Sequence, residues 1–198
     1  MDSRNDIYDA LLNTAKETST WLQSAADDIK NVLEALLKTE YKKNYSLRKM
    51  AAANLLNPDL QDYIADNEKK RLIDHLQQIH HHLTETNKDM NNIQHTLSFV
   101  HGDQVTDPTI KAALDKQLQN MVDLNRTYRK TFEAEHINTM ILGDYKGLAS
   151  RVLSPAQSVG ALNEQLKGLY KQTDSLKNQA KVVANDIAKV AKPRPGQR

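Results

Sequence analysis

The side chains best suited to chemistry are histidines gathered in one stretch of the chain. Six of the seven histidines occur there: His75, His80, His81, His82, His95 and His101. Neighbouring residues of a helix point about 100° apart, so three consecutive histidines cannot hold one ion. His81 and Glu85 have the i,i+4 spacing of metal ligands on a helix, but they supply only two ligands. We therefore expect a solvated face. The alternative is a pH-sensing cluster, because imidazoles titrate close to physiological pH.

A second pattern with chemical potential is Glu-x-x-His, which occurs once, at Glu133-Ala134-Glu135-His136. Two facing copies of this motif build a di-metal carboxylate site in a four-helix bundle. A single copy does not, so we expect His136 to be a hydrogen-bonded core histidine. The chain also lacks a Gly-rich phosphate loop, a nucleophile elbow and a His-Glu-x-x-His motif. We predict no catalytic, metal or cofactor site, and hence no enzyme.

The strongest candidate for a binding surface is the segment 38–49. It carries five basic residues against one acidic residue, interleaved with two tyrosines. Such a patch suits phosphates, anionic lipid headgroups or an acidic protein surface. The plain alternative is a solvated helix face. The interaction candidates are Tyr41, Lys42, Lys43, Tyr45, Arg48 and Lys49.

Composition points to long helices. The chain has 198 residues with 39% hydrophobic residues, 26% charged residues, few aromatics, six Gly and five Pro. The absence of cysteine excludes disulfides, thiolate nucleophiles and thiolate metal sites. A net charge of +2 is too small to indicate a dedicated nucleic-acid binder.

No apolar run approaches the length of a membrane span, and the first residues lack an apolar signal-peptide core. Cytoplasmic residence is therefore the default expectation. A secreted or periplasmic protein from which a leader has been removed would show the same sequence.

Helix breakers divide the chain into four long segments, about 6–56, 58–101, 107–142 and 155–191. Pro58, Pro108 and Pro155 each follow a residue typical of a helix N-cap, and proline is well tolerated at the first helical position. Short connections favour antiparallel neighbours. We predict an all-α fold, an elongated antiparallel bundle of three or four helices with coiled-coil packing. It forms a single domain over 1–192, followed by a disordered basic tail, 193–198.

Two segments carry apolar seams with a spacing of 3.5 residues, which predicts left-handed supercoiling. The first seam is Leu72, Leu76, Ile79, Leu83, Thr86, Met90, Ile93, Leu97 and Val100. The second is Val159, Leu162, Leu166, Leu169, Thr173, Leu176, Ala180, Val183, Ile187 and Val190. Thr86 and Thr173 are polar residues within these seams. We hypothesise that they share a layer that sets helix register, against the alternative that threonine is simply tolerated there.

The other two segments have less regular seams. The first holds Ile7, Leu11, Thr18, Leu22, Ala25, Ile29, Val32 and Leu36, and its pattern weakens at 41–46, where we expect a bend or short break. The third holds Ile110, Leu114, Met121, Leu124, Tyr128 and Phe132. Beyond Phe132 the apolar positions move to Ile137, Met140 and Ile141, which predicts a shift of the seam.

Residues 54–63, Asn-Leu-Leu-Asn-Pro-Asp-Leu-Gln-Asp-Tyr, together with the polar helix 159–190, resemble the minor pilus subunits of type IV secretion systems. That resemblance implies a helical bundle with an Asn-Pro link after its first helix. This chain departs from it by entering a four-heptad helix directly after the link. No functional residues are carried over.

These observations favour a non-enzymatic structural or interaction protein. It would be a component or adaptor of a larger assembly, such as a bacterial secretion or pilus apparatus, a secreted factor or a phage component. Its partners would be proteins bound through helix faces, including a second copy in a homo-oligomer. The alternative is a helical module that binds a membrane surface or nucleic acid through the 38–49 patch.

Overall fold

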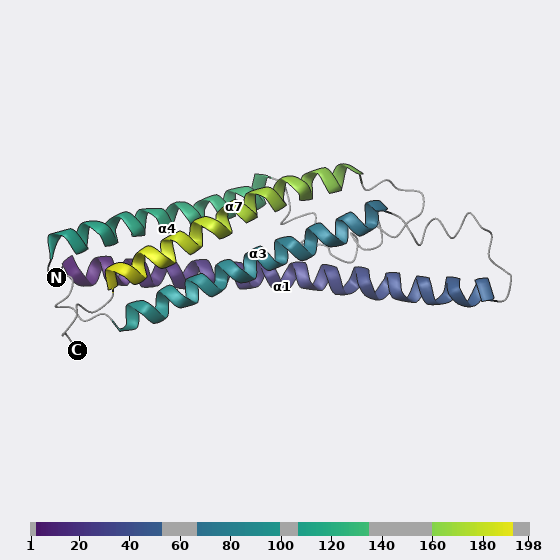
Figure 1. The fold of residues 1–198 in the computed structure, drawn as a ribbon, viewed down its shortest axis with the longest axis horizontal. Helices are drawn as coiled ribbons and strands as arrows, with labels where there is room; N and C mark the ends of the chain where they lie inside the picture. The colour runs from purple at the N-terminus through teal and green to yellow at the C-terminus, as the bar shows by residue number, and fades with distance from the viewer. Residues whose placement is uncertain (1–2, 53–66, 100–106, 135–159, 192–198) are drawn as a thin grey trace. The chain divides into compact units, whose positions relative to one another are not determined.

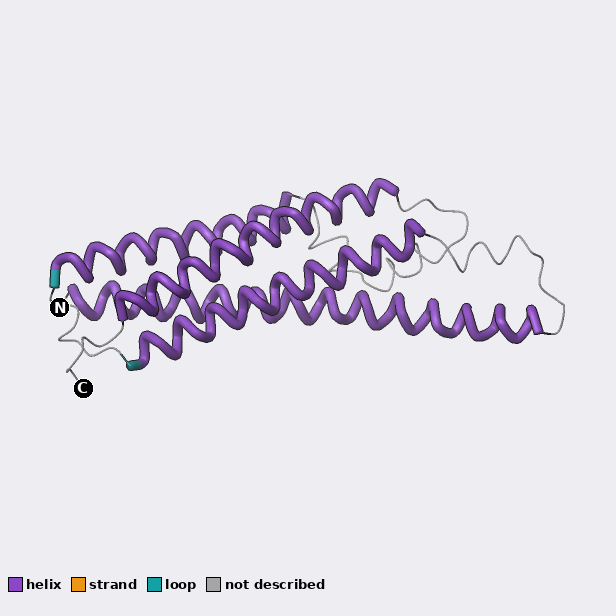
Figure 2. Tube along the Cα trace, viewed as in Figure 1, coloured by secondary structure: helices purple, strands orange, loops and turns teal. Residues whose placement is uncertain are grey.

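The described regular structure is entirely helical. The computed structural model describes residues 3–52, 67–99, 107–134 and 160–191, with side chains for 7–34, 71–99, 107–133 and 163–191. Within these ranges there are four helices and no strand (Figures 1 and 2). They are α1 (Ser3–Ala52), α3 (Asn67–Ser98), α4 (Pro108–Ala134) and α7 (Gly160–Ala191). The prediction of an all-α helical bundle is confirmed.

The start of α4 follows the predicted capping chemistry. Helix α4 begins at Pro108, and the preceding Asp107 accepts a hydrogen bond at Oδ1 from the Thr109 backbone N–H, 2.8 Å away. The Asp107 carbonyl accepts the Lys111 N–H at 3.0 Å, the first bond of the helical ladder. Asp107 thus pairs one of the backbone donors that a helix start leaves without an intrahelical partner.

Of the bend or short break expected near 41–46, the break is wrong, because α1 is an uninterrupted helix from Ser3 to Ala52, and the bend stays a prediction. Residues 41–46 contain neither Gly nor Pro and include two lysines, which are good helix formers, so local propensity allows the helix to continue where the apolar pattern weakens. Four other predictions fall outside the described residues: the caps at Pro58 and Pro155, the seam shift after Phe132 and the tail 193–198.

The helices contribute to two compact units. The first comprises Met1–Ser24, His82–Thr131 and Gln172–Arg198, and the second comprises Ala25–His81 and Phe132–Lys171. Each unit therefore takes a part of all four helices. A single domain over 1–192 stays a prediction.

Within the first unit, contacts between helices define chain direction. Tyr8 of α1 donates a hydrogen bond to the Leu97 carbonyl of α3 at 2.9 Å, and Ser19, further along α1, bonds to the earlier Asn87 of α3. These two helices are therefore antiparallel. Helices α1 and α4 are parallel, because Thr18 pairs with Asn125 and Trp21 lies against Tyr128.

Helices α4 and α7 are antiparallel as well. Gln117, early in α4, pairs with Asp186, late in α7, whereas the later Leu124 lines a shared groove with the earlier Ser175. The four segments of the first unit thus alternate in direction along the chain, as short connections predict.

The predicted seams form the core. Every described seam position of α3 is at most 2% exposed: Leu72, Leu76, Ile79, Leu83, Thr86, Met90, Ile93 and Leu97. The seam of α7 is at most 5% exposed from Leu166 to Ile187, and its last described residue, Val190, is partly buried. In α1 and α4 the largest buried side chains include Leu11, Leu22, Ile29, Tyr128 and Phe132.

The buried stripe is wider than the seam. Ala26, His82 and Thr131 are additional buried positions that flank the predicted ones, whereas Ala15 and Gln117 occupy seam positions that the predicted seams had left vacant. A helix that contacts two neighbours buries about three positions per heptad, whereas a two-stranded seam buries two. The flanking positions are therefore where the structure adds residues to the predicted core.

Candidate functional site

The predicted interaction residues lie in the second half of α1, where the backbone is helical throughout 38–49. Their side chains lie outside the described ones. At 100° per residue, helical register alone places five of the six candidates within an arc of about 120°. These are Tyr41, Lys42, Tyr45, Arg48 and Lys49, whereas Lys43 falls outside that arc.

The histidine stretch is not a uniform solvated face. His81 and His95 are exposed, and His75 and His80 are partly buried. His82 is only 2% exposed, so the prediction of a solvated face is wrong for this residue. The physical reason is that His82 flanks the seam, one turn before Thr86, at a position that a helix with two neighbours also buries.

Six polar side chains in the first unit form two hydrogen-bonded sets that together involve all four helices, and we call them the polar layer. They are Thr18, His82, Thr86, Asn125, Tyr128 and Thr173. Five of them are at most 2% exposed, and Asn125 is half-buried.

Thr86 and Tyr128 join α3 to α4. Their hydroxyl oxygens are 2.6 Å apart, and Thr86 Oγ1 also donates to the His82 carbonyl at 2.8 Å. A threonine hydroxyl has one proton, so Tyr128 must be the donor in the pair. Burial raises the pKa of the Tyr128 hydroxyl, with a smaller contribution from Asp89, and the bond to Thr86 offsets only part of this. Tyr128 therefore remains a neutral donor.

His82 joins α3 to α7. Its Nδ1 lies 2.8 Å from Thr173 Oγ1, and its Nε2 lies 3.5 Å from Asp174 Oδ1. A neutral imidazole that carries its proton on Nε2 can accept the Thr173 proton and donate toward Asp174. Lys177 Nζ approaches the same Asp174 oxygen at 3.1 Å, which balances the carboxylate charge. Each polar atom of the His82 ring therefore has a partner.

Thr18 joins α1 to α4 by accepting a hydrogen bond from Asn125 Nδ2 at 2.7 Å. One turn further along α1, the Trp21 ring lies 5.9 Å from the Tyr128 ring, tilted by 48°. Such tilted aromatic pairs add stability beyond the area that they bury. Through these contacts the polar layer includes α1 as well as the other three helices.

Both threonines of the register hypothesis make hydrogen bonds to His82. Thr86 bonds to the His82 carbonyl within its own helix, and Thr173 bonds to the His82 ring across helices. A shared layer of the two threonines that sets register stays a hypothesis, and the structure adds to them a histidine that the sequence pattern placed on the solvent side. Its i,i+4 spacing to Thr86 is the signal that could have identified it.

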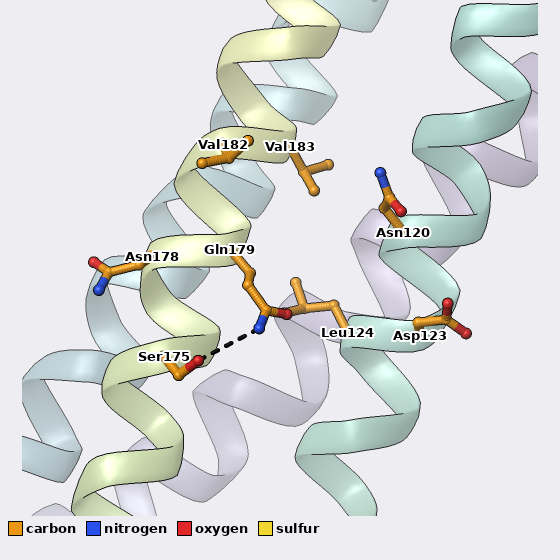
Figure 3. A pocket seen from close by; sticks show the side chains of 8 residues that line it. All are labelled: Asn120, Asp123, Leu124, Ser175, Asn178, Gln179, Val182 and Val183. Atoms are coloured by element: carbon orange, nitrogen blue, oxygen red, sulfur yellow. Dashed lines mark hydrogen bonds between the residues drawn. The ribbon is translucent and has the colours of Figure 1, made fainter.

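A groove between α4 and α7 lies on the surface of the first unit and has room for a ligand. We call it the α4–α7 groove, and its volume is about 560 Å³. Its lining residues are Asn120, Asp123, Leu124, Ser175, Asn178, Gln179, Val182 and Val183. Figure 3 shows Gln179 of α7 and Leu124 of α4 pointing toward each other across it.

The groove has an apolar floor and a polar rim. Leu124 and Val183 are almost completely buried, whereas the Val182 side chain is 58% exposed. Val182 and Phe99, which is 65% exposed, are the exposed large hydrophobic residues among those described. Asp123 forms a long ion pair, 3.9 Å, with Arg126 one turn away. The groove therefore combines amide groups with accessible apolar surface.

Neither a metal cluster nor a membrane span is found in the part of the chain that the structure describes. No three His, Asp or Glu side chains in these ranges come together as metal ligands. None of the described helices is long and apolar enough to cross a bilayer. His136 of the Glu-x-x-His motif lies outside the described residues.

Comparison with known proteins finds no match: no family model, no curated protein and no solved structure is similar to this chain. The residues themselves therefore carry the functional argument.

Proposed function

We propose that the protein is a non-enzymatic structural or interaction protein, a helical bundle that serves as a component or adaptor of a larger assembly. Bacterial secretion or pilus apparatus, secreted factors and phage particles are the settings that suit such a bundle. The observation that carries the proposal is the polar layer, in which mostly buried polar groups, among them His82, form hydrogen bonds that link neighbouring helices.

Buried hydrogen-bonded groups favour one helix register over its alternatives, usually at some cost in core stability. A slip of α3 by one turn would remove Thr86 from Tyr128 and His82 from Thr173. A bundle with a single register presents each outer helix face at a defined height and angle. That property supports a scaffold that positions partners.

The described surface supplies a place for contact. The exposed Val182 stands beside the apolar floor of the α4–α7 groove. Aromatic and aliphatic side chains accessible next to a concave surface are typical of protein interfaces. A scaffold therefore has both parts that it needs, a fixed register inside and an accessible face outside.

The test is the size of the native particle. Epitope-tagged full-length protein would be released from its source cells by gentle lysis and sized by light scattering after gel filtration. We expect a particle far heavier than one 22.4 kDa chain or a pair of chains. The double variant His82→Ala, Thr173→Ala should lose incorporation while the exposed control Gln77→Ala retains it. A chain that migrates alone in the extract contradicts the proposal.

A second function is favoured by the helical backbone of α1 over 38–49. In this register, three basic residues and two tyrosines share one arc of the helix, a pattern typical of helices that lie on anionic membranes or along phosphate backbones. This alternative is a helical module that binds a membrane surface or nucleic acid.

Adjacent lysines provide a matched test of the second function. Lys42→Glu and Lys43→Glu make the same charge change, but only Lys42 lies in the arc. Binding is measured by sedimentation with vesicles that contain phosphatidylserine and by gel shift with duplex DNA. The affinity should fall several-fold for Lys42→Glu and much less for Lys43→Glu. A wild-type protein that ignores both vesicles and DNA eliminates this function.

A further inference from the structure

The α4–α7 groove has lining chemistry that is complementary to itself. Asn120, Asn178 and Gln179 carry amides, and each amide both donates and accepts hydrogen bonds. Amides can therefore pair with copies of themselves, whereas carboxylates or ammonium groups facing their own copies would repel. Ser175 adds a hydroxyl with the same double capacity.

The groove is also close to electrically neutral. Its single formally charged lining residue is Asp123, and Arg126 approaches that carboxylate at 3.9 Å from the next turn of α4. Neutrality disfavours a strongly charged ligand, such as a phosphate or a basic peptide, as the occupant. It allows two identical surfaces to meet, because Asp123 is the one charged lining residue that each copy brings, and Arg126 lies one turn away from it.

A projection and a recess lie side by side on this face. Val182 is 58% exposed on the rim, and the floor beside it is formed by the buried Leu124 and Val183. An interface with two-fold symmetry uses the same patch twice, so it needs both features on one surface. Turning one copy about such an axis can bring each Val182 into the recess of the other.

We propose that the α4–α7 groove binds a second copy of this chain, making a two-fold homodimer in which Val182 of each copy enters the groove of the other. The inference rests on the proposed function, because it names the first partner of the scaffold. The amides around the valine then pair across the interface, and removal of Val182 from water provides the apolar contribution.

The first experiment measures the mass of the purified full-length protein by sedimentation equilibrium between about 5 and 200 µM, a range that covers micromolar dimers. We expect a mass near twice 22.4 kDa at the upper concentrations. Val182→Asp should shift the dissociation constant at least tenfold toward monomer, with an unchanged circular dichroism spectrum because the side chain is exposed. A wild-type monomer throughout, or a dimer that Val182→Asp leaves intact, overturns the proposal.

The matched control is Asn185→Asp. Asn185 is an exposed residue of α7 that does not line the groove, so this change adds the same charge to the same helix outside the proposed interface. The control should dimerise like the wild type. If both variants dissociate, the effect is one of net charge, and the placement of the interface is wrong.

Thiol cross-linking tests the geometry directly, because the chain has no native cysteine. In a mixture of Val182→Cys and Ser175→Cys proteins, mild oxidation should join unlike chains, whereas mixing Asn185→Cys with Ser175→Cys should give little product. An equal yield from both mixtures overturns the arrangement. The cell-extract particle distinguishes the two proposals: a monomeric purified protein that still enters a large particle refutes the homodimer and leaves the scaffold function standing.

Discussion

The polar layer and the α4–α7 groove are built from similar side chains but behave as opposites. Both contain amides and hydroxyls where helices meet. In the polar layer the helices are close enough for Thr86 to reach Tyr128 at 2.6 Å. In the groove the helices leave a space of about 560 Å³, and the amides line it instead of closing it. The same chemistry is structural where helices touch and available for binding where they separate.

The largest expected effect is a difference in how much a substitution in each region lowers the stability of the fold. His82→Ala should lower the free energy of unfolding by about 3 kcal/mol, because it creates a cavity and removes a hydrogen-bond partner of the buried Thr173. Asn178→Ala in the groove should change it by less than about 0.5 kcal/mol, since that residue is exposed. Urea unfolding of both variants measures the difference. Equal losses would show that the groove is closed in solution.

A double-mutant cycle sharpens the same contrast. Thr86→Val leaves the Tyr128 hydroxyl buried without its acceptor, at a cost of about 1–3 kcal/mol, whereas adding Tyr128→Phe removes the stranded group. The pair should therefore show a coupling energy of about 1 kcal/mol or more. The exposed Ser175–Gln179 pair, 3.4 Å apart on the groove, is the control and should show none beyond error.

These two regions also show how far sequence reasoning reaches. Heptad spacing identified the buried faces of α3 and α7, including both threonines, because burial in helices follows a strict period. It missed His82, which flanks the seam and is buried because its helix has two neighbours, and Gln117, a polar residue at the seam position between Leu114 and Met121. It also missed the groove, since the separation of two helices depends on how complete side chains pack against each other.

Charge next to the polar layer gives a pH-dependent prediction. Burial raises the pKa of Asp89, and Lys181 offsets part of that shift. Because the folded-state pKa is raised, the ionised carboxylate opposes folding, and stability is lost as the pH rises from below the ordinary value of 3.8 through the higher folded-state value. Asp89→Asn should therefore melt higher than the wild type at pH 7, and the advantage should vanish below pH 3.8.

Asp123→Asn on the groove is the control for this measurement. Its carboxylate is 66% exposed, and exposed charges contribute little to stability. If Asp123→Asn gives the same gain in melting temperature as Asp89→Asn, the gain comes from net charge and burial of Asp89 is not its cause.

The smallest expected effect is a pH dependence of the melting temperature that arises from a partly buried histidine of the second unit. Burial, and then the Lys30 charge, lower the pKa of His80, against a smaller opposing contribution from Asp27. Because the folded-state pKa is lowered, His80 contributes to the stability of the fold above its ordinary pKa of 6.5. That stability is lost as the pH falls below this value. His80→Gln should reduce the change in melting temperature between pH 5 and 7.5. The same substitution at the exposed His81 should leave that change as it is in the wild type. A wild-type melting temperature that is constant across this range contradicts the prediction.

The long sequence separations within the polar layer have a consequence for synthesis. Asn125 follows its partner Thr18 by 107 residues, and Thr173 follows His82 by 91. At about 5–20 residues per second, the ribosome makes α1 at least several seconds before the α4 residue that pairs with it. A nascent chain that stops before Gln172 has every seam residue of α3 but lacks Thr173, which bonds to the His82 ring. The first unit therefore cannot finish folding during translation until Thr173 and the rest of α7 have emerged.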